Sequence, residues 1–197
     1  MGRPRALERD EILDAAEAAA RRLGAARLTL GAVAAEAGVS KATVLYDFKS
    51  KDGLIGALIE RRLAAESAES AAFRAALGPD ARDAAIRAHV ARAGRAPTEE
   101  ERAVILSFAA ALARQNELAE PIRAHYAHCV RDIMDTSTEP RGAFLAFLAL
   151  EGLHCLERFD VFRLDAENRR RVLADIAWLA EQAPAAPESE GASRCDG

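Results

Sequence analysis

The chain has 197 residues and a formal net charge of −4, and half of its residues are hydrophobic. This length fits one large domain or a small domain joined to a larger one, and the negative charge argues against a protein that binds nucleic acid over its whole surface. The three cysteines are too few and too unevenly spaced for a disulfide framework, so we expect a reducing, cytoplasmic compartment.

The composition predicts an all-α protein. Alanine, leucine, arginine and glutamate, which favour helices, dominate the chain, whereas the strand formers valine, isoleucine and threonine are sparse. The N-terminal segment MGRPRALERDE lacks the apolar centre of a signal peptide. The longest apolar run, Ala143 to Leu150, is too short to span a bilayer, so we expect no membrane association.

Four helices are predicted in the N-terminal part of the chain. Apolar residues recur at helical spacing from Leu7 to Leu23. Thr29, Ser40 and Ser50 are good N-caps, and each begins a further helix. The last of these is long and ends near residue 77 at a Gly-Pro-Asp turn.

Five more helices are predicted from the same periodicity and from Gly/Pro breaks. The first follows the Gly-Pro-Asp turn and ends near residue 92. The other four cover residues 98–115, 121–134, 141–158 and 165–181. Pro121 disfavours a helical Glu120. We therefore expect a three-helix unit at residues 1–48, a six-helix domain at residues 50–182, and a disordered tail at residues 183–197, which is rich in Pro, Ser and Glu.

The segment from Leu30 to Lys51 has the features of a helix-turn-helix. Ala34 is small enough for two helix backbones to approach closely, and Gly38 stands where the turn requires a positive φ. Val33, Val39 and Val44 are spaced to form a small core between the two helices. Each position has its own physical reason, and together they predict a reader of duplex DNA. The alternative from the same residues is a three-helix core that binds no DNA.

The second helix of this motif would enter the major groove by its N-terminal end. Ser40, Lys41, Ala42 and Thr43 would then lie nearest the base edges. The remaining predicted contacts go to phosphates, from the side chains of Tyr46, Lys49 and Lys51 and from the backbone at Thr29. Lys41, Lys49 and Lys51 are the only lysines of the chain, and residues 1–62 carry a net charge of +2 against −6 for the rest.

The N-terminal segment resembles the DNA-binding domain of the TetR family of bacterial transcriptional repressors. The residues that carry the resemblance are Gly2-Arg3-Pro4, Ile12-Leu13, Ala15-Ala16, Leu23-Gly24, Thr29, Val33-Ala34, Ala37-Gly38-Val39-Ser40-Lys41, Thr43, Tyr46, Phe48, Ser50-Lys51 and Leu54. Two positions depart from the family pattern, with Leu45 where a tyrosine is common and Asp47 where a histidine or tyrosine is common. Phe48 is interpreted as a core residue. Beyond residue 62 only the helical pattern and the length resemble the family.

The resemblance implies that residues 1–48 are a three-helix DNA-binding domain and that residues 50–182 are a six-helix ligand-binding, regulatory and dimerisation domain. It also implies a homodimer and a small-molecule effector. In the family the last two long helices pair with their copies, and here they offer Phe144, Leu145, Phe147, Leu148, the segment 150–153, Val172, Leu173, Ile176, Trp178 and Leu179. A two-fold dimer would bind a pseudo-palindromic, double-stranded operator. The effector pocket is expected between the fourth and eighth helices, lined by Phe73, Ile105, Phe108, Leu112, Tyr126, Phe147, Glu151 and His154. A packed core without a cavity is the alternative for these residues.

Three functional hypotheses follow. The first is a dimeric repressor that a small molecule releases from its operator; the second is a constitutive or architectural DNA-binding protein without an inducer; the third is a helical protein-interaction adaptor. No catalytic elbow, phosphate loop or nucleotide fingerprint occurs, so we expect neither enzymatic activity nor a cofactor. A metal or thiol sensor built from His125, His128, Cys129, His154 and Cys155 is a further alternative, although the spacing gives no complete ligand set.

Overall fold

The computed structural model describes residues 5–23, 27–112 and 116–184. These residues form nine α-helices and contain no β-strand, which confirms the all-α prediction. The helices are α1 (Arg5–Leu23), α2 (Leu30–Ala37), α3 (Lys41–Phe48), α4 (Lys51–Leu77), α5 (Ala84–Arg92), α6 (Glu99–Leu112), α7 (Glu120–Thr136), α8 (Pro140–Arg158) and α9 (Ala166–Ala180). The predicted disordered tail lies outside the described residues, except for its first two positions.

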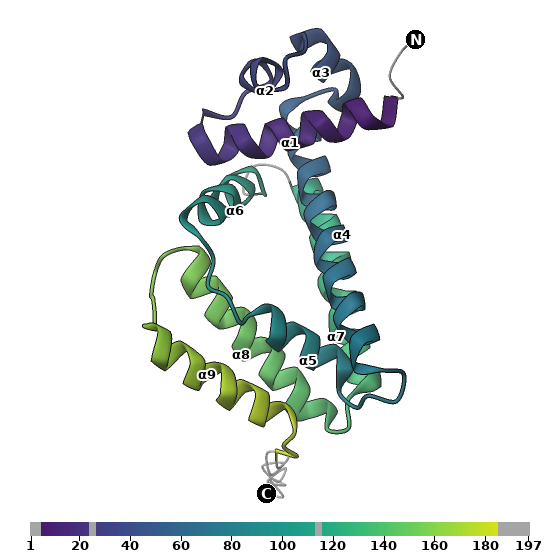
Figure 1. Cartoon of the computed structure of the whole chain (residues 1–197), viewed down its shortest axis with the longest axis vertical. Coiled ribbons are helices and arrows are strands. Elements are labelled where there is room, and N and C mark those ends of the chain that lie inside the picture. The colour runs from purple at the N-terminus through teal and green to yellow at the C-terminus, as the bar shows by residue number, and fades with distance from the viewer. Residues whose placement is uncertain (1–4, 24–26, 113–115, 185–197) are drawn as a thin grey trace, which may run out of the picture.

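The helices form two groups that the long helix α4 connects (Figure 1). Helices α1, α2 and α3 pack together at one end of the molecule, and α5, α8 and α9 lie towards the other end. Helix α7 runs beside α4, and α6 packs under α1. None of the described helices is long and apolar enough to cross a lipid bilayer.

Three predicted caps begin the helices around the turn. Thr29 Oγ1 accepts a hydrogen bond of 3.1 Å from the Ala32 amide, and Ser40 Oγ accepts one of 3.0 Å from the Thr43 amide. Ser50 caps α4 in the same way. Gly38 ends α2 with a φ of 66°, in the left-handed conformation that glycine adopts at little cost. The local chemistry therefore fixes both ends of the turn, as the sequence predicted.

The core around α1, α2 and α3 extends beyond the predicted boundary at residue 48. Its fully buried side chains include Ile12, Val33 and Val44, and Phe48 is 4% exposed, which confirms its interpretation as a core residue. Leu54 and Leu58 of α4 and Val104 of α6 belong to the same cluster. Side chains of α4 and α6, which come later in the chain, therefore complete the core of the N-terminal unit.

A second core joins α5, α7, α8 and α9. A Cβ added to Gly142 of α8 would lie 2.1 Å from the carbonyl oxygen of Gln182, so α8 and the end of α9 approach each other at backbone distance. This core corrects the list of residues expected at a dimer interface. Phe147, Leu150 and Ile176 from that list fill the space between these four helices, and Leu153 is also buried within the subunit.

One local prediction needs correction. Helix α7 begins at Glu120, one residue before Pro121, because a proline at the second position of a helix withholds an amide that has no intrahelical partner. Residues Asn116–Ala119, which precede α7, form a short 3-10 helix. The predicted end of the sixth helix at Gln115 lies outside the described residues.

Candidate functional site

Helix α3 presents one polar edge and one buried face. Lys41 and Ala42 are exposed at its N-terminal end, and Tyr46 is 58% exposed one turn later. Val44 and Phe48 face the core on the opposite side. Thr43 is half-buried, and its hydroxyl lies 2.9 Å from Ser40 Oγ, so the two side chains form one polar group at the start of the helix. This edge has the size and chemistry for base contacts in a major groove.

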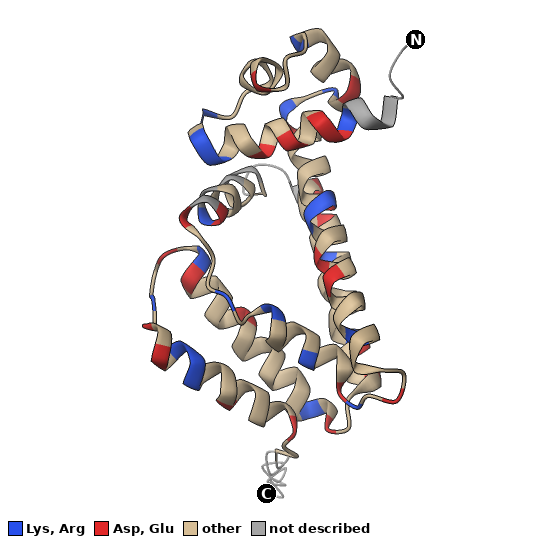
Figure 2. Ribbon diagram, viewed as in Figure 1, with Lys and Arg blue, Asp and Glu red and all other residues tan. Residues whose placement is uncertain are grey.

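Lysines stand at both ends of α3 and at the start of α4 (Figure 2). Lys49 ends α3 with a φ of 64°, and its ammonium donates a hydrogen bond of 2.6 Å to the carbonyl oxygen of Tyr46. The same ammonium lies 4.8 Å from the centre of the Tyr46 ring. Lys51 opens α4, and Thr29 opens α2. Seven of the eight predicted DNA-contact residues thus lie on α3, at its caps or at the start of α4, whereas Thr29 caps the N-terminal end of α2, the end away from the turn that leads to α3.

A close backbone contact joins α3 to α4. A Cβ added to Gly53 would lie 2.1 Å from the carbonyl oxygen of Phe48, so only glycine fits at this position in the first turn of α4. Sequence reasoning missed this residue, since a glycine near a helix start carries no signal of what lies opposite. The contact means that a movement of the first turn of α4 is transmitted to the end of α3.

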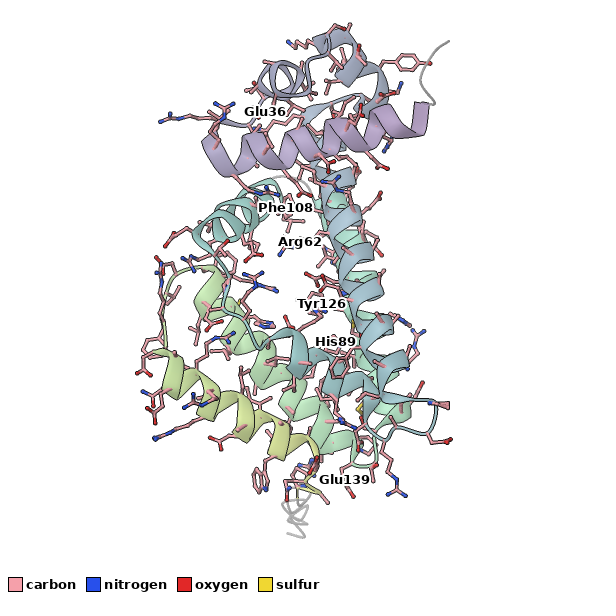
Figure 3. The ribbon with its side chains drawn as sticks, viewed as in Figure 1. Glu36, Arg62, His89, Phe108, Tyr126 and Glu139 are labelled. Atoms are coloured by element: carbon pink, nitrogen blue, oxygen red, sulfur yellow. The ribbon has the colours of Figure 1, made fainter. Side chains whose placement is uncertain are left out.

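An apolar cavity of about 230 Å³ lies between α4, α6, α7 and α8. Five of the eight predicted effector contacts line it: Ile105, Phe108, Leu112, Tyr126 and Glu151. Its other lining residues were not predicted: Ile59, Arg62, Leu63, Glu66, Ala109, Ile122, Cys155, Arg158 and Phe159. Figure 3 shows Phe108, Arg62, Tyr126 and His89 one after another along the length of α4.

A polar cavity of about 530 Å³ adjoins the apolar one, and the two share Arg62, Glu66, Ile105 and Arg158. His154, a sixth predicted contact, lines this polar cavity. The remaining two predicted residues lie elsewhere. Phe147 is buried in the core, with its ring centre 6.2 Å from that of Tyr126, and Phe73 lines a separate groove of about 250 Å³ with residues of α5 and α9.

Glu151 is the centre of a polar cluster in the cavity wall. The Tyr126 hydroxyl donates a hydrogen bond of 2.7 Å to its carboxylate, and His154 Nδ1 lies 3.4 Å from the other carboxylate oxygen. Burial disfavours the ionised form, but the contacts with His154 and Tyr126 outweigh burial and lower the pKa of Glu151 to about 2. Burial and the adjacent carboxylate raise the pKa of Tyr126. Glu151 is therefore an anion at neutral pH, and Tyr126 is neutral.

The positions of the cysteines and histidines do not favour a metal-binding or thiol-based sensor site. Cys129 is buried, its sulfur lies 3.6 Å from His125 Nε2, and burial raises the pKa of its thiol. Cys155 is exposed and lines the apolar cavity. Within the described residues, no three His, Cys, Asp or Glu side chains gather closely enough to hold a metal ion.

Two family models match the chain. Residues 12–58 match the model of bacterial regulatory proteins of the tetR family, and residues 83–181 match the tetracyclin repressor-like C-terminal domain. The chain belongs to the TetR family. It is therefore a transcription regulator with a helix-turn-helix DNA-binding domain, which agrees with the polar edge of α3.

Solved structures of TetR-family proteins share the fold. A TetR transcription regulator from Haloarcula marismortui ATCC 43049 is 16% identical with a TM-score of 0.71, covering 89% of this chain and 97% of that one. A TetR-family member from Streptomyces coelicolor A3 is 25% identical with a TM-score of 0.64, covering 86% and 97%. The multidrug binding protein EbrR in complex with ethidium is 26% identical with a TM-score of 0.63, covering 89% and 99%. No curated protein matches the chain in sequence.

Proposed function

We propose that the protein is a dimeric repressor that binds a pseudo-palindromic operator and is released by a small molecule in the apolar cavity. One observation carries this proposal: a single helix, α4, both lines the cavity and contacts α3, the helix proposed to enter the major groove. Ile59, Leu63 and Glu66 of α4 face the cavity, and Gly53 in its first turn touches the backbone of Phe48. A molecule that repositions α4 therefore repositions α3.

The two ends of α3 have separate roles in this proposal. Lys41, Ala42 and Thr43 read bases, because they are at the N-terminal end that enters the groove first. Tyr46 and Lys49, together with Lys51 and the amide ends capped by Thr29 and Ser50, hold phosphates and set the register. Leu45, 46% exposed, lies on the same side of α3 and offers an apolar contact where the family commonly has a tyrosine.

The dimer would form on the exposed apolar side of α8 and α9. Leu145, Leu148 and Leu156 follow one another along α8 at steps of three and eight residues and are 38–50% exposed. A Cβ added to Gly152, which lies between them in the sequence, would meet no atom within 4 Å, so the surface there is open. Trp178 on α9 is 62% exposed. Exposed apolar side chains of this size on two neighbouring helices favour burial against a second copy.

Release of DNA requires that the effector prefer one position of α4, and the effect can be no larger than that preference. The likeness to EbrR supports the binding of a small molecule, since that protein is a multidrug binding protein solved with ethidium, malachite green and imidazole. The wall of the cavity combines apolar groups with Tyr126 and Glu151, which is typical of small-molecule sites.

The test is fluorescence anisotropy with a duplex from the region upstream of the protein's own coding sequence. We expect salt-sensitive binding that the double substitution Lys41→Ala and Thr43→Ala abolishes while the dimer remains intact in sedimentation. Specific binding by this double variant would refute the assignment of the reading edge. Absence of any salt-sensitive DNA binding by the wild type would refute the function itself. Thermal-shift screening with small molecules then separates a ligand-responsive regulator from a constitutive one.

A further inference from the structure

The wall between the apolar and polar cavities carries one stripe of polar side chains from α8. Glu151, His154 and Arg158 follow one another at steps of three and four residues, so they lie on the same face of the helix. Glu151 and Arg158 line the apolar cavity, and His154 and Arg158 line the polar one. Arg158 is therefore accessible from both sides of the wall.

The carboxylates of the apolar cavity already have partners within the protein. Glu66 binds the guanidinium of Arg92 at 3.0 Å and that of Arg62 at 3.6 Å. Glu151 accepts the hydrogen bond from Tyr126 and contacts His154. A positively charged ligand would have to compete with these contacts for either carboxylate.

Arg158 has no such partner. Its side chain is half-buried, yet within the described part of the chain it makes no hydrogen bond and no ion pair. The other arginines around the polar cavity are paired, including Arg61 with Asp14 at 2.7 Å and Arg95 with Glu101 at 2.6 Å. Glu69 also lines that cavity, but it is exposed. The Arg158 guanidinium, which stays charged at any physiological pH, thus has no hydrogen-bonded anion next to the apolar space, and its charge acts on Glu151 only at longer range, where it helps to lower the pKa of that carboxyl.

His154 is a second nitrogen group in the same wall, and its nearest anion is the Glu151 carboxylate, 3.4 Å from Nδ1. It is 8% exposed, and its Nδ1 is buried and makes no hydrogen bond among the described residues. Arg158, one turn further along α8, is therefore the group in this wall that is left to contact an added anion.

We propose that the effector is an amphipathic carboxylate whose apolar body fills the apolar cavity and whose carboxylate binds Arg158. Arg158 offers the planar, two-pronged donor geometry that matches a carboxylate. The body packs between Leu63 of α4, Phe108 of α6 and Ile122 of α7, which are all in the cavity wall. This inference rests on the proposed function, because it names the chemical class of the ligand that would move α4.

The experiment compares three probes with the same ring system and different charge: 2-naphthylacetate, its neutral amide 2-naphthylacetamide, and 2-(2-naphthyl)ethylammonium. Calorimetric titration into the full-length dimer measures the three dissociation constants. A charge-assisted contact with Arg158 predicts that the carboxylate binds about ten-fold or more tightly than the amide, and the ammonium weakest. Arg158→Gln should bring the affinity for the carboxylate to that for the amide without changing the latter.

Arg171→Gln is the matched control, because Arg171 is exposed on α9 and paired with Glu167; it should change none of the three affinities. The inference is overturned if Arg158→Gln leaves carboxylate binding unchanged, if the ammonium binds most tightly, or if no probe binds. Operator release, followed separately by anisotropy, tests the proposed function. Arg158-dependent binding that leaves the protein on DNA would support the site and refute ligand-responsive repression, whereas release by the ammonium or amide alone would do the opposite.

Discussion

The guanidinium of Arg169 and the carboxylate of Glu157 form an ion pair of 2.6 Å, and both side chains are more than nine-tenths buried. The same guanidinium donates to the carbonyl oxygens of Gly94 at 3.2 Å and Arg95 at 3.4 Å. One side chain of α9 therefore holds α8 and the connection between α5 and α6. That connection leads directly into the helix that closes the N-terminal core.

Replacing Arg169 by methionine should lower the free energy of unfolding by about 3–5 kcal/mol, because Glu157 would remain buried without a counter-charge. Urea denaturation measures the effect. Arg171→Met is the control, since the exposed pair with Glu167 should contribute about 1 kcal/mol or less. The double variant Arg169→Met, Glu157→Leu should recover much of the loss. A destabilisation below about 1 kcal/mol in the single variant would contradict the structural role given to this pair.

Gly53→Ala should weaken DNA binding at least ten-fold and destabilise the protein by about 1–3 kcal/mol, because the new methyl group would collide with the backbone of Phe48. Anisotropy titration and thermal denaturation measure the two effects. Gly31→Ala provides the comparison: its Cβ would meet only the Thr29 hydroxyl at 3.9 Å, so the gain in helix propensity should leave stability equal or slightly higher. Equal behaviour of the two variants would show that the α3–α4 contact is not tight.

The caps at Thr29, Ser40 and Ser50 could be predicted from sequence because each depends on atoms within three residues of the cap. The effector residues were harder. Helical periodicity identified Phe108 and Tyr126 as inward-facing, but it could not separate a cavity wall from a packed core, which is where Phe147 lies. Arg62, Glu66 and Arg158 were missed because charged residues on helices are usually solvated, and only the tertiary arrangement turns them inward.

Leu148→Glu should convert the proposed dimer into a monomer, since a carboxylate at the centre of an apolar interface loses its hydration without gaining a partner. Sedimentation velocity at several protein concentrations measures the change. Met134→Glu on α7 replaces a side chain of similar exposure (41% against 50%) away from that surface and should leave the assembly unchanged. A dimer that survives Leu148→Glu would place the interface elsewhere.

His89 should make the protein less stable as the pH falls from 6.5 towards 4. Burial against Phe147, whose ring centre is 5.1 Å away, together with Arg92 lowers the pKa of His89 to about 4, against a partial opposing effect of Glu151. The unfolded chain binds a proton at higher pH than the folded one, so stability is full above pH 6.5 and lost below it. The loss at pH 5 is about 2 kcal/mol.

Urea midpoints at pH 7 and pH 5 for the wild type and His89→Leu measure this contribution. The difference between the two pH values should be smaller in the variant. Glu151 acts in a lower range, since its depressed pKa removes stability only below its unfolded value near 4.5. An identical pH response of both proteins would show that His89 is hydrated and titrates normally.

Val104 belongs to the core around α1, α2 and α3, and Phe108 packs against it. This packing limits the exchange of DNA-binding domains between family members. A chimera that grafts residues 1–58 onto the remainder of another family member would lack the two side chains that complete this core. Such hybrids should misfold or lose response unless residues 104 and 108 are transferred as well. Phe108 also lines the apolar cavity. The residues at positions 104 and 108 therefore determine which N-terminal DNA-binding domain can be combined with which C-terminal domain.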